Sequence, residues 1–197
     1  MSKETTKVVI LTTAQDAFQS GEEPTLELVL HHRENRVQFQ NKLVAMYPKN
    51  TLIALKVNMP GPIKNNELVQ ALIGIGKQLL KTYTTNQGWQ CVYEKDIDTL
   101  AGVEYFVVVD EPSITNVKKA MIDLEDHQLL GRLFDLDVFQ SDYGSISRED
   151  LGYTSRRCLI CHESSKDCGR NRTHSVRELH EKIIELLKEE GSVTFND

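Results

Sequence analysis

Long apolar runs and an excess of basic residues are both absent from this sequence. No stretch approaches the roughly 20 consecutive apolar residues that a membrane-spanning helix requires, so we expect no membrane partner. Polar residues interrupt positions 1–20, where a signal peptide would need an apolar core, and we therefore expect a cytoplasmic protein. The formal net charge of −6 argues against a nucleic-acid partner, because general nucleic-acid binders present a basic face.

Cysteine is scarce, and its distribution excludes a disulfide framework. Cys91 lies far upstream of the other three cysteines, which fall within residues 158–168. Disulfide scaffolds belong to small secreted domains, whereas cytoplasmic proteins keep their thiols reduced. A cysteine cluster in a protein of this class is typical of metal binding.

The clustered cysteines continue into a histidine with the spacing of a zinc site. The pattern is Cys-x2-Cys-x6-Cys-x5-His, formed by Cys158, Cys161, Cys168 and His174. Three thiolates and one imidazole make a tetrahedral set with no open position, so we expect a structural Zn²⁺ that staples a loop-rich segment. His162 is a competing ligand, and reduced cysteines without metal are the alternative interpretation.

The chain length suits one domain of generous size or one domain with a small appendage. Its 197 residues, 40% of them hydrophobic, can supply a single core. We expect residues 1–22 to be a polar lead-in and residues 23–145 to form the catalytic core. Residues 146–197 then form a Cys/Arg-rich segment and a C-terminal helix packed on that core.

Helical and strand patterns interleave along the core. Helices are predicted over residues 24–46, 66–83, 113–126 and 175–190, and strands over residues 51–57, 89–93, 103–109 and 131–138. This alternation favours an α/β (α+β) fold, with a mixed sheet flanked by helices.

Two aspartates stand in the apolar segment 131–138. Successive side chains of a strand point to opposite faces, so Asp135 and Asp137 share one face while Phe134, Leu136 and Val138 fill the other. Neighbouring carboxylates repel each other unless a cation lies between them, and such oxygen ligands suit Mg²⁺ together with substrate phosphates. The pattern indicates metal-dependent phosphoryl or nucleotidyl transfer. The alternative is an edge strand with one wet face.

Further residues near this segment suit phosphate chemistry. Arg132 could grip a phosphate with its planar guanidinium, and Gly131 would let the backbone approach it closely. Lys64 is a second candidate phosphate contact. His127 is the histidine nearest to the aspartates in sequence and a candidate general base. Three candidates for a third carboxylate ligand are not ranked by the sequence: Glu104, Asp110 and Glu125.

Four blocks of the sequence, in this order, resemble the apo-citrate lyase phosphoribosyl-dephospho-CoA transferase family. They comprise residues 58–64, 131–138, 147–152 and 156–174, and the resemblance covers about residues 25–185. It implies a nucleotidyltransferase-like fold and reaction. The prosthetic group 2′-(5″-triphosphoribosyl)-3′-dephospho-CoA is joined to a serine of the acyl carrier (gamma) subunit of citrate lyase, and diphosphate is released.

The resemblance implies roles for the residues already singled out. Asp135 and Asp137 would bind Mg²⁺, and Arg132 and Lys64 would hold triphosphate oxygens. A local basic patch surrounds the cysteines, and it could bind the donor's phosphates or attract an acidic carrier protein, unless it is an ordinary solvated surface. The substrate-binding residues expected here are Arg148, Arg156 and Arg157, alongside Lys64 and Gly131.

Two other functions remain open at this stage. The first is a zinc-stabilised module that binds phosphates or RNA through the arginine-rich segment without catalysis. The second is a related enzyme that modifies the carrier of malonate decarboxylase. Paired carboxylates discriminate against the pure binder, because a phosphate-binding surface has no use for them.

Overall fold

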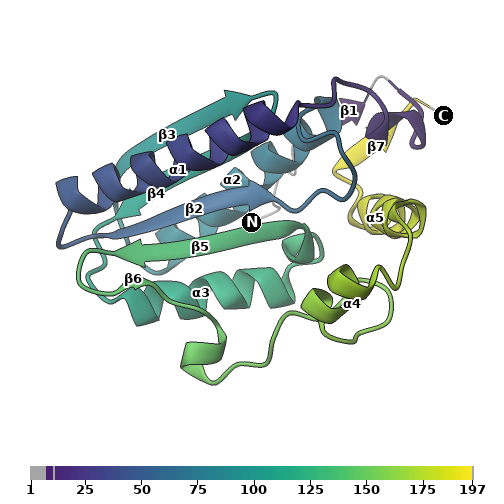
Figure 1. The fold of residues 1–197 in the computed structure, drawn as a ribbon. Helices are drawn as coiled ribbons and strands as arrows, with labels where there is room; N and C mark the ends of the chain where they lie inside the picture. Colours follow the sequence, from purple (N-terminus) through teal and green to yellow (C-terminus); the bar gives the residue numbers. More distant parts are fainter. Residues whose placement is uncertain (1–7, 11, 197) are drawn as a thin grey trace.

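The main sheet is antiparallel throughout and has the strand order β3-β4-β2-β5-β6 (Figure 1). The computed structural model describes residues 8–10 and 12–196. The strands of this sheet are β2 (Thr51–Val57), β3 (Cys91–Thr99), β4 (Gly102–Val109), β5 (Phe134–Gln140) and β6 (Gly144–Ser145). A separate parallel pair joins β1 (Val8–Ile10) to β7 (Val193–Phe195). The predicted α/β class is confirmed, and in the described chain the parallel pairing is confined to this small second sheet.

Helices cover both faces of the main sheet (Figure 1). They are α1 (Leu26–Met46), α2 (Glu67–Asn86), α3 (Ile114–His127), α4 (Ser165–Asn171) and α5 (Val176–Glu190). Helices α1, α2, α3 and α5 begin at a polar cap whose side chain accepts a backbone N–H, and Ser113 and Ser175 are two of these caps. Within the described residues, no helix combines the length and apolar character needed to cross a membrane.

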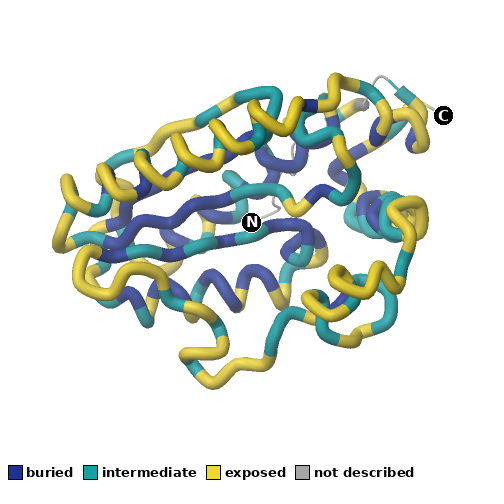
Figure 2. Tube along the Cα trace, in the orientation of Figure 1, coloured by how far each residue is buried: buried dark blue, intermediate teal, exposed yellow. Residues whose placement is uncertain are grey.

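The alternation of side chains along β2 divides the interior into two cores. Ile53 and Leu55 face the larger core, which contains residues of α2, α3 and α5. Leu52 and Ala54 face a smaller core beneath α1, closed by Leu43 of that helix. In Figure 2, β2 and β5 cross the middle of the molecule and consist mostly of buried and half-buried residues, whereas α1 is exposed along its outer side. The aspartates of β5 belong to the α1 side, since Phe139 on the same face packs in the smaller core.

The segment before β5 differs from the prediction. Residues 131–133 form a 3-10 turn, and the strand begins at Phe134. A Cβ atom on Gly131 would lie 2.2 Å from the carbonyl oxygen of Leu124, so glycine is required for this turn to pack against α3. Gly131 is buried here, and its observed role is close packing of two backbone segments.

The unpaired edge of β5 is covered by side chains of α3. Strand β6 pairs only with Phe139 and Gln140, so the first part of β5 has no neighbouring strand on that side. The Leu136 backbone N–H donates to Glu125 at 2.9 Å, and its carbonyl accepts from Lys118 Nζ at 2.9 Å. Two side chains thus satisfy the backbone where a strand would otherwise bind.

The N-terminal segment packs more closely than a polar lead-in would. Residues 1–7 and 11 of the predicted lead-in, like residue 197, lie outside the described residues. In the described part, Val8–Ile10 forms β1 and Phe18 is buried. The Phe18 ring stacks on His180 of α5 at a centroid distance of 4.0 Å. The apolar pair Ala17 and Phe18 is too short a signal to stand out among polar neighbours.

Candidate active site

Asp135 and Asp137 face the same lysine on the neighbouring strand. In the antiparallel pairing of β2 with β5, Lys56 lies opposite Asp135 and Ala54 lies opposite Asp137. The three charged side chains therefore project from one face of the sheet. Lys56 Nζ lies 2.8 Å from Oδ2 of Asp135 and 3.1 Å from Oδ2 of Asp137. Both carboxylates converge on one cation.

The charges in this group stabilise one another. Burial alone would raise the pKa of Asp135, but the Lys56 ammonium and the Arg156 guanidinium outweigh burial and hold that pKa below its ordinary value. Burial alone would lower the pKa of Lys56, yet Asp135 and Asp137 raise it above its ordinary value. At neutral pH Asp135 is therefore ionised and Lys56 is protonated.

A buried carboxylate, Glu125 of α3, holds two of the arginines that were predicted to bind substrate. Its side chain is 3% exposed and forms ion pairs with Arg148 at 2.7 Å and Arg156 at 2.6 Å. The same Arg156 Nη2 atom lies 3.7 Å from Oδ1 of Asp135. Arg148 also pairs with Asp126, and these two carboxylates raise its pKa against the opposing effect of burial. Arg156 thus stands between α3 and the aspartate pair.

The candidates for a third carboxylate lie in different places. Glu104 pairs with Arg36 of α1 at 3.2 Å, and Asp110 follows the opposite end of β4. Glu125 lines the hollow that contains both aspartates. His127, the candidate base, is exposed at the end of α3.

Two adjoining hollows share part of their lining beside the aspartate pair. One has a volume of about 340 Å³ and is lined by Asp135 and Asp137. The other has a volume of about 630 Å³ and lies between the cysteine segment and the start of α5. Both hollows share three lining residues: Asn58, Arg156 and Ser165. We call the larger one the arginine cavity.

The arginine cavity is lined by four arginines and, among the described residues around it, by no carboxylate. The four are Arg132, Arg156, Arg157 and Arg172. The Nε atom of Arg132 is buried without a hydrogen-bond partner. Burial, together with Arg156, lowers the pKa of Arg132. A net charge of −6 for the whole chain makes this local excess of positive charge stand out.

The connector at residues 58–62 forms another wall of the arginine cavity. Asn58 N–H donates to the Leu133 carbonyl at 2.8 Å, which fastens the connector to the turn before β5. His180 hydrogen-bonds to the Pro60 carbonyl at 2.9 Å, which fastens it to α5. Lys64 Nζ donates to the Met59 carbonyl at 3.0 Å, and burial lowers its pKa, aided by Arg33. Lys64 is absent from the described linings of both hollows.

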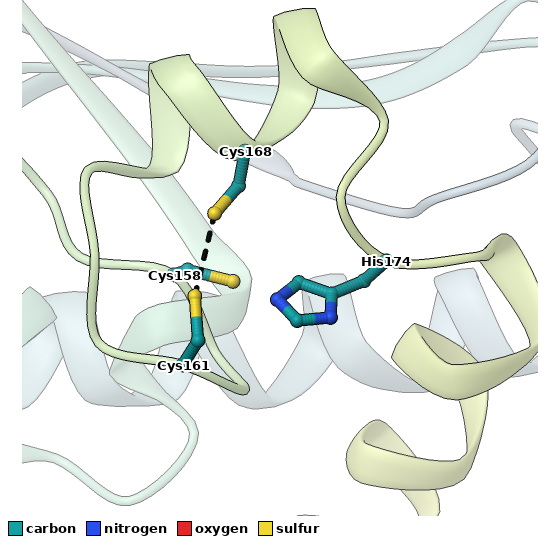
Figure 3. A group of neighbouring side chains, drawn as sticks. All are labelled: Cys158, Cys161, Cys168 and His174. Atoms are coloured by element: carbon teal, nitrogen blue, oxygen red, sulfur yellow. Dashed lines mark hydrogen bonds between the residues drawn. The ribbon is translucent and has the colours of Figure 1, made fainter.

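Cys158, Cys161, Cys168 and His174 come together as the spacing predicted (Figure 3). Their candidate ligand atoms all lie within 4.8 Å of one another, and the Cys161 and Cys168 sulfurs are 3.4 Å apart. A ring nitrogen of His174 faces the sulfurs in Figure 3, and its Nε2 atom is buried without a hydrogen-bond partner. This group could bind a metal such as zinc.

The thiol chemistry around Cys158 agrees with a metal-binding group. Burial alone would raise the pKa of Cys158, but hydrogen bonds from the backbone of Cys161 and Ile160 lower it. The Ile160 N–H approaches the Cys158 sulfur at 3.5 Å. A thiolate, the form that ligates metal, is favoured at this position.

Comparison with known proteins adds an independent finding. The model of the family described as apo-citrate lyase phosphoribosyl-dephospho-CoA transferase matches residues 24–190. The chain belongs to this family. The name of the apo-citrate lyase phosphoribosyl-dephospho-CoA transferase family describes a transferase that acts on apo-citrate lyase, and the predicted membership is confirmed.

Curated relatives agree with the family match. A probable apo-citrate lyase phosphoribosyl-dephospho-CoA transferase of Streptococcus pyogenes serotype M5 (strain Manfredo) is 36% identical over 88% of this chain and 91% of its own length. A protein of the same name from Vibrio cholerae serotype O1 (strain M66-2) is 36% identical over 82% of this chain and 90% of its own. "Protein CitXG" of Leuconostoc mesenteroides subsp. cremoris is 35% identical over 87% of this chain. The chain spans only 37% of that longer relative.

Three residues of the candidate site in this family member were not predicted from the sequence. Lys56 is the one charged residue in the apolar strand β2, and this isolated charge was the feature of the sequence that could have indicated a functional role. Asn58 belongs to a block that carried the family resemblance but had no assigned role. Arg172, in a left-handed conformation at the end of α4, belongs to the block 156–174 that carried the family resemblance and to the basic patch, but it had no role of its own.

Proposed function

We propose that this protein transfers 2′-(5″-triphosphoribosyl)-3′-dephospho-CoA to a serine of the apo acyl carrier subunit of citrate lyase. The reaction is a nucleotidyl transfer in which the serine oxygen attacks the phosphorus nearest the ribose and diphosphate leaves. One observation carries the proposal beyond the family name. Asp135 and Asp137 converge on one cation in a hollow that shares Arg156 with an arginine-lined cavity.

The aspartates are suited to hold Mg²⁺. Their Oδ2 atoms already converge on the Lys56 ammonium at 2.8 and 3.1 Å, so they can direct two hard oxygen ligands at one ion. When bound, the ion would neutralise charge on the reacting phosphate. Arg156, 3.7 Å from Asp135 and held by Glu125, is placed to bind a phosphate oxygen beside the aspartates.

Lys56 occupies the position that a divalent ion would take, and we predict that the two compete. Replacing Lys56 by methionine should tighten Mn²⁺ binding by about tenfold or more. Two positive charges this close repel by more than the roughly 1.4 kcal/mol that a tenfold change requires. Electron paramagnetic resonance of Mn²⁺ titrated into the protein without substrates measures the affinity. Lys95→Met on the exposed strand β3 is the matched control, and equal affinities of all three proteins would refute the competition.

The transfer itself is tested with purified components. The protein is incubated with Mg²⁺, the triphosphoribosyl donor and folded apo carrier, while the mass of the carrier and the released diphosphate are followed. We expect one diphosphate per modified carrier and no product with a carrier whose acceptor serine is alanine. No mass gain on the folded citrate lyase carrier would refute the proposal. Gain only on the malonate decarboxylase carrier would reassign the acceptor, and phosphate binding without any transfer would favour a binding module.

A further inference from the structure

We infer that the arginine cavity binds the diphosphate that leaves in the reaction. The donor's two outer phosphates lie in this cavity, while the phosphate nearest the ribose lies over Asp135 and Asp137. This inference rests on the proposed function, since the transfer supplies the diphosphate. It assigns the leaving group a site distinct from the aspartates.

The charge of the cavity favours a compact polyanion. Four guanidinium groups line it, and the described lining residues include no carboxylate. Arg156 pairs with two carboxylates that line the smaller hollow, Glu125 at 2.6 Å and Asp135 at 3.7 Å. Arginine's planar fork matches phosphate oxygens, and several forks around one volume suit a ligand with several charged oxygens.

Arg132 provides a specific reason for a ligand. Its Nε–H is buried without a hydrogen-bond partner, which costs free energy unless an acceptor is present. Burial and the neighbouring Arg156 lower the pKa of Arg132 against the opposing effects of Asp126 and Cys158, so an anion in the cavity would further stabilise its charged form. The start of α5 also borders the cavity through Ser175 and Val176, and a helix N-terminus adds a favourable field for an anion.

The position of the cavity matches the order of phosphates in the donor. Arg156 lines both hollows and lies 3.7 Å from Asp135, so a chain of linked phosphates can pass from one hollow to the other beside it. The cavity volume of about 630 Å³ falls within the range of small-molecule sites. A phosphate chain anchored in the cavity would point its innermost phosphorus at the aspartates.

The site gives the arginines a defined part in the reaction. A bond forms between the carrier serine oxygen and the innermost phosphorus, and the bond from that phosphorus to the bridging oxygen breaks. The electron pair of the broken bond remains on diphosphate, which takes up the proton of the serine hydroxyl. Guanidinium groups around the leaving phosphates stabilise the charge that develops there.

Inorganic diphosphate tests the site without donor or carrier. Isothermal titration calorimetry should detect its binding to the wild-type protein. Arg132→Met and Arg172→Met should each weaken binding by about tenfold, in line with the loss of one charge-assisted hydrogen-bonding group. Arg177→Met is the matched control, because it removes the same charge from the first turn of α5 but its side chain is 85% exposed. Arg172 is exposed, so that variant remains informative if Arg132→Met fails to fold.

The outcomes separate this inference from the proposed function. A protein that transfers the prosthetic group but binds diphosphate equally well in all variants refutes the cavity assignment and leaves the transfer standing. Displacement of diphosphate by pantetheine, which has no phosphate, would place the donor's thiol arm in the cavity and also refute the assignment. Arginine-dependent diphosphate binding without any transfer would instead refute the proposed function.

Discussion

Replacing Asp135 by asparagine should lower the transfer rate by about a thousandfold and leave the fold intact. The amide keeps the shape of the side chain but removes the negative charge, and a metal-ligand carboxylate is worth several kcal/mol of transition-state stabilisation. Asp135 is 35% exposed and belongs to no apolar core, so its loss leaves packing unchanged. The same result is expected for Asp137→Asn. Single-turnover transfer measures the rate, and thermal unfolding reports the fold.

Asp142→Asn is the control for this experiment. Asp142 is exposed in the turn between β5 and β6, close in sequence to the aspartate pair. It should transfer at the wild-type rate. Near-normal turnover of either Asp135→Asn or Asp137→Asn would show that the residue concerned is not a metal ligand of the reaction.

Removing metal from the group Cys158, Cys161, Cys168 and His174 should lower the melting temperature by about 10 °C. A structural zinc site contributes its binding free energy to folding, and a loss of about 3 kcal/mol shifts a chain of this size by roughly that amount. Metal analysis of the purified protein should find one zinc per chain. Cys161→Ser should abolish zinc retention and give the same drop, and chelation of the wild type should reproduce it.

Cys91→Ser is the matched control, because Cys91 is exposed on β3 and lies outside the group. Its zinc content and melting temperature should equal those of the wild type. Three of the four grouped residues, Cys158, Cys168 and His174, also line the arginine cavity, so chelation should weaken diphosphate binding as well. Metal-free protein with full stability would exclude a structural ion.

Much of the fold was predictable because local signals agreed with the tertiary structure. Ser113 and Ser175 start their helices as caps, and Gly191 ends α5 in a left-handed conformation. Strand β2 was predicted over its full length from a continuous apolar run. The cysteine group was predictable for a different reason, since ligand spacing within one short segment leaves few ways to arrange it.

Other features depend on contacts that no local pattern encodes. Helix α4 has seven residues and buries none of them, so it carries no apolar periodicity. Strand β3 lies at the sheet edge, where charged residues such as Asp96 break the alternation, and only its first residues were predicted. Lys56 lies beside the aspartates because β2 pairs with β5 in a particular register. The two strands are about 80 residues apart in the sequence, so no local pattern reveals this contact.

The arginines show why a basic patch is an ambiguous signal. Arg148 and Arg156 were predicted to bind substrate, and the structure gives both a buried carboxylate partner, Glu125. Arg132 has no such partner and faces a cavity. The three-dimensional structure is needed to distinguish an arginine held in an ion pair from one available to a ligand. The substrate-binding roles of all three arginines stay predictions.

The side chains that cover the free edge of β5 bear on the solubility of the enzyme. An open strand edge invites pairing with a second chain, which leads to aggregation. Lys118 and Glu125 engage the Leu136 backbone from the side and block such pairing without adding a strand. Glu125 also pairs with Arg156, which lies beside Asp135, so the covered edge is joined to the candidate site. Replacing either Lys118 or Glu125 by alanine should therefore increase self-association of the protein as well as lower its turnover.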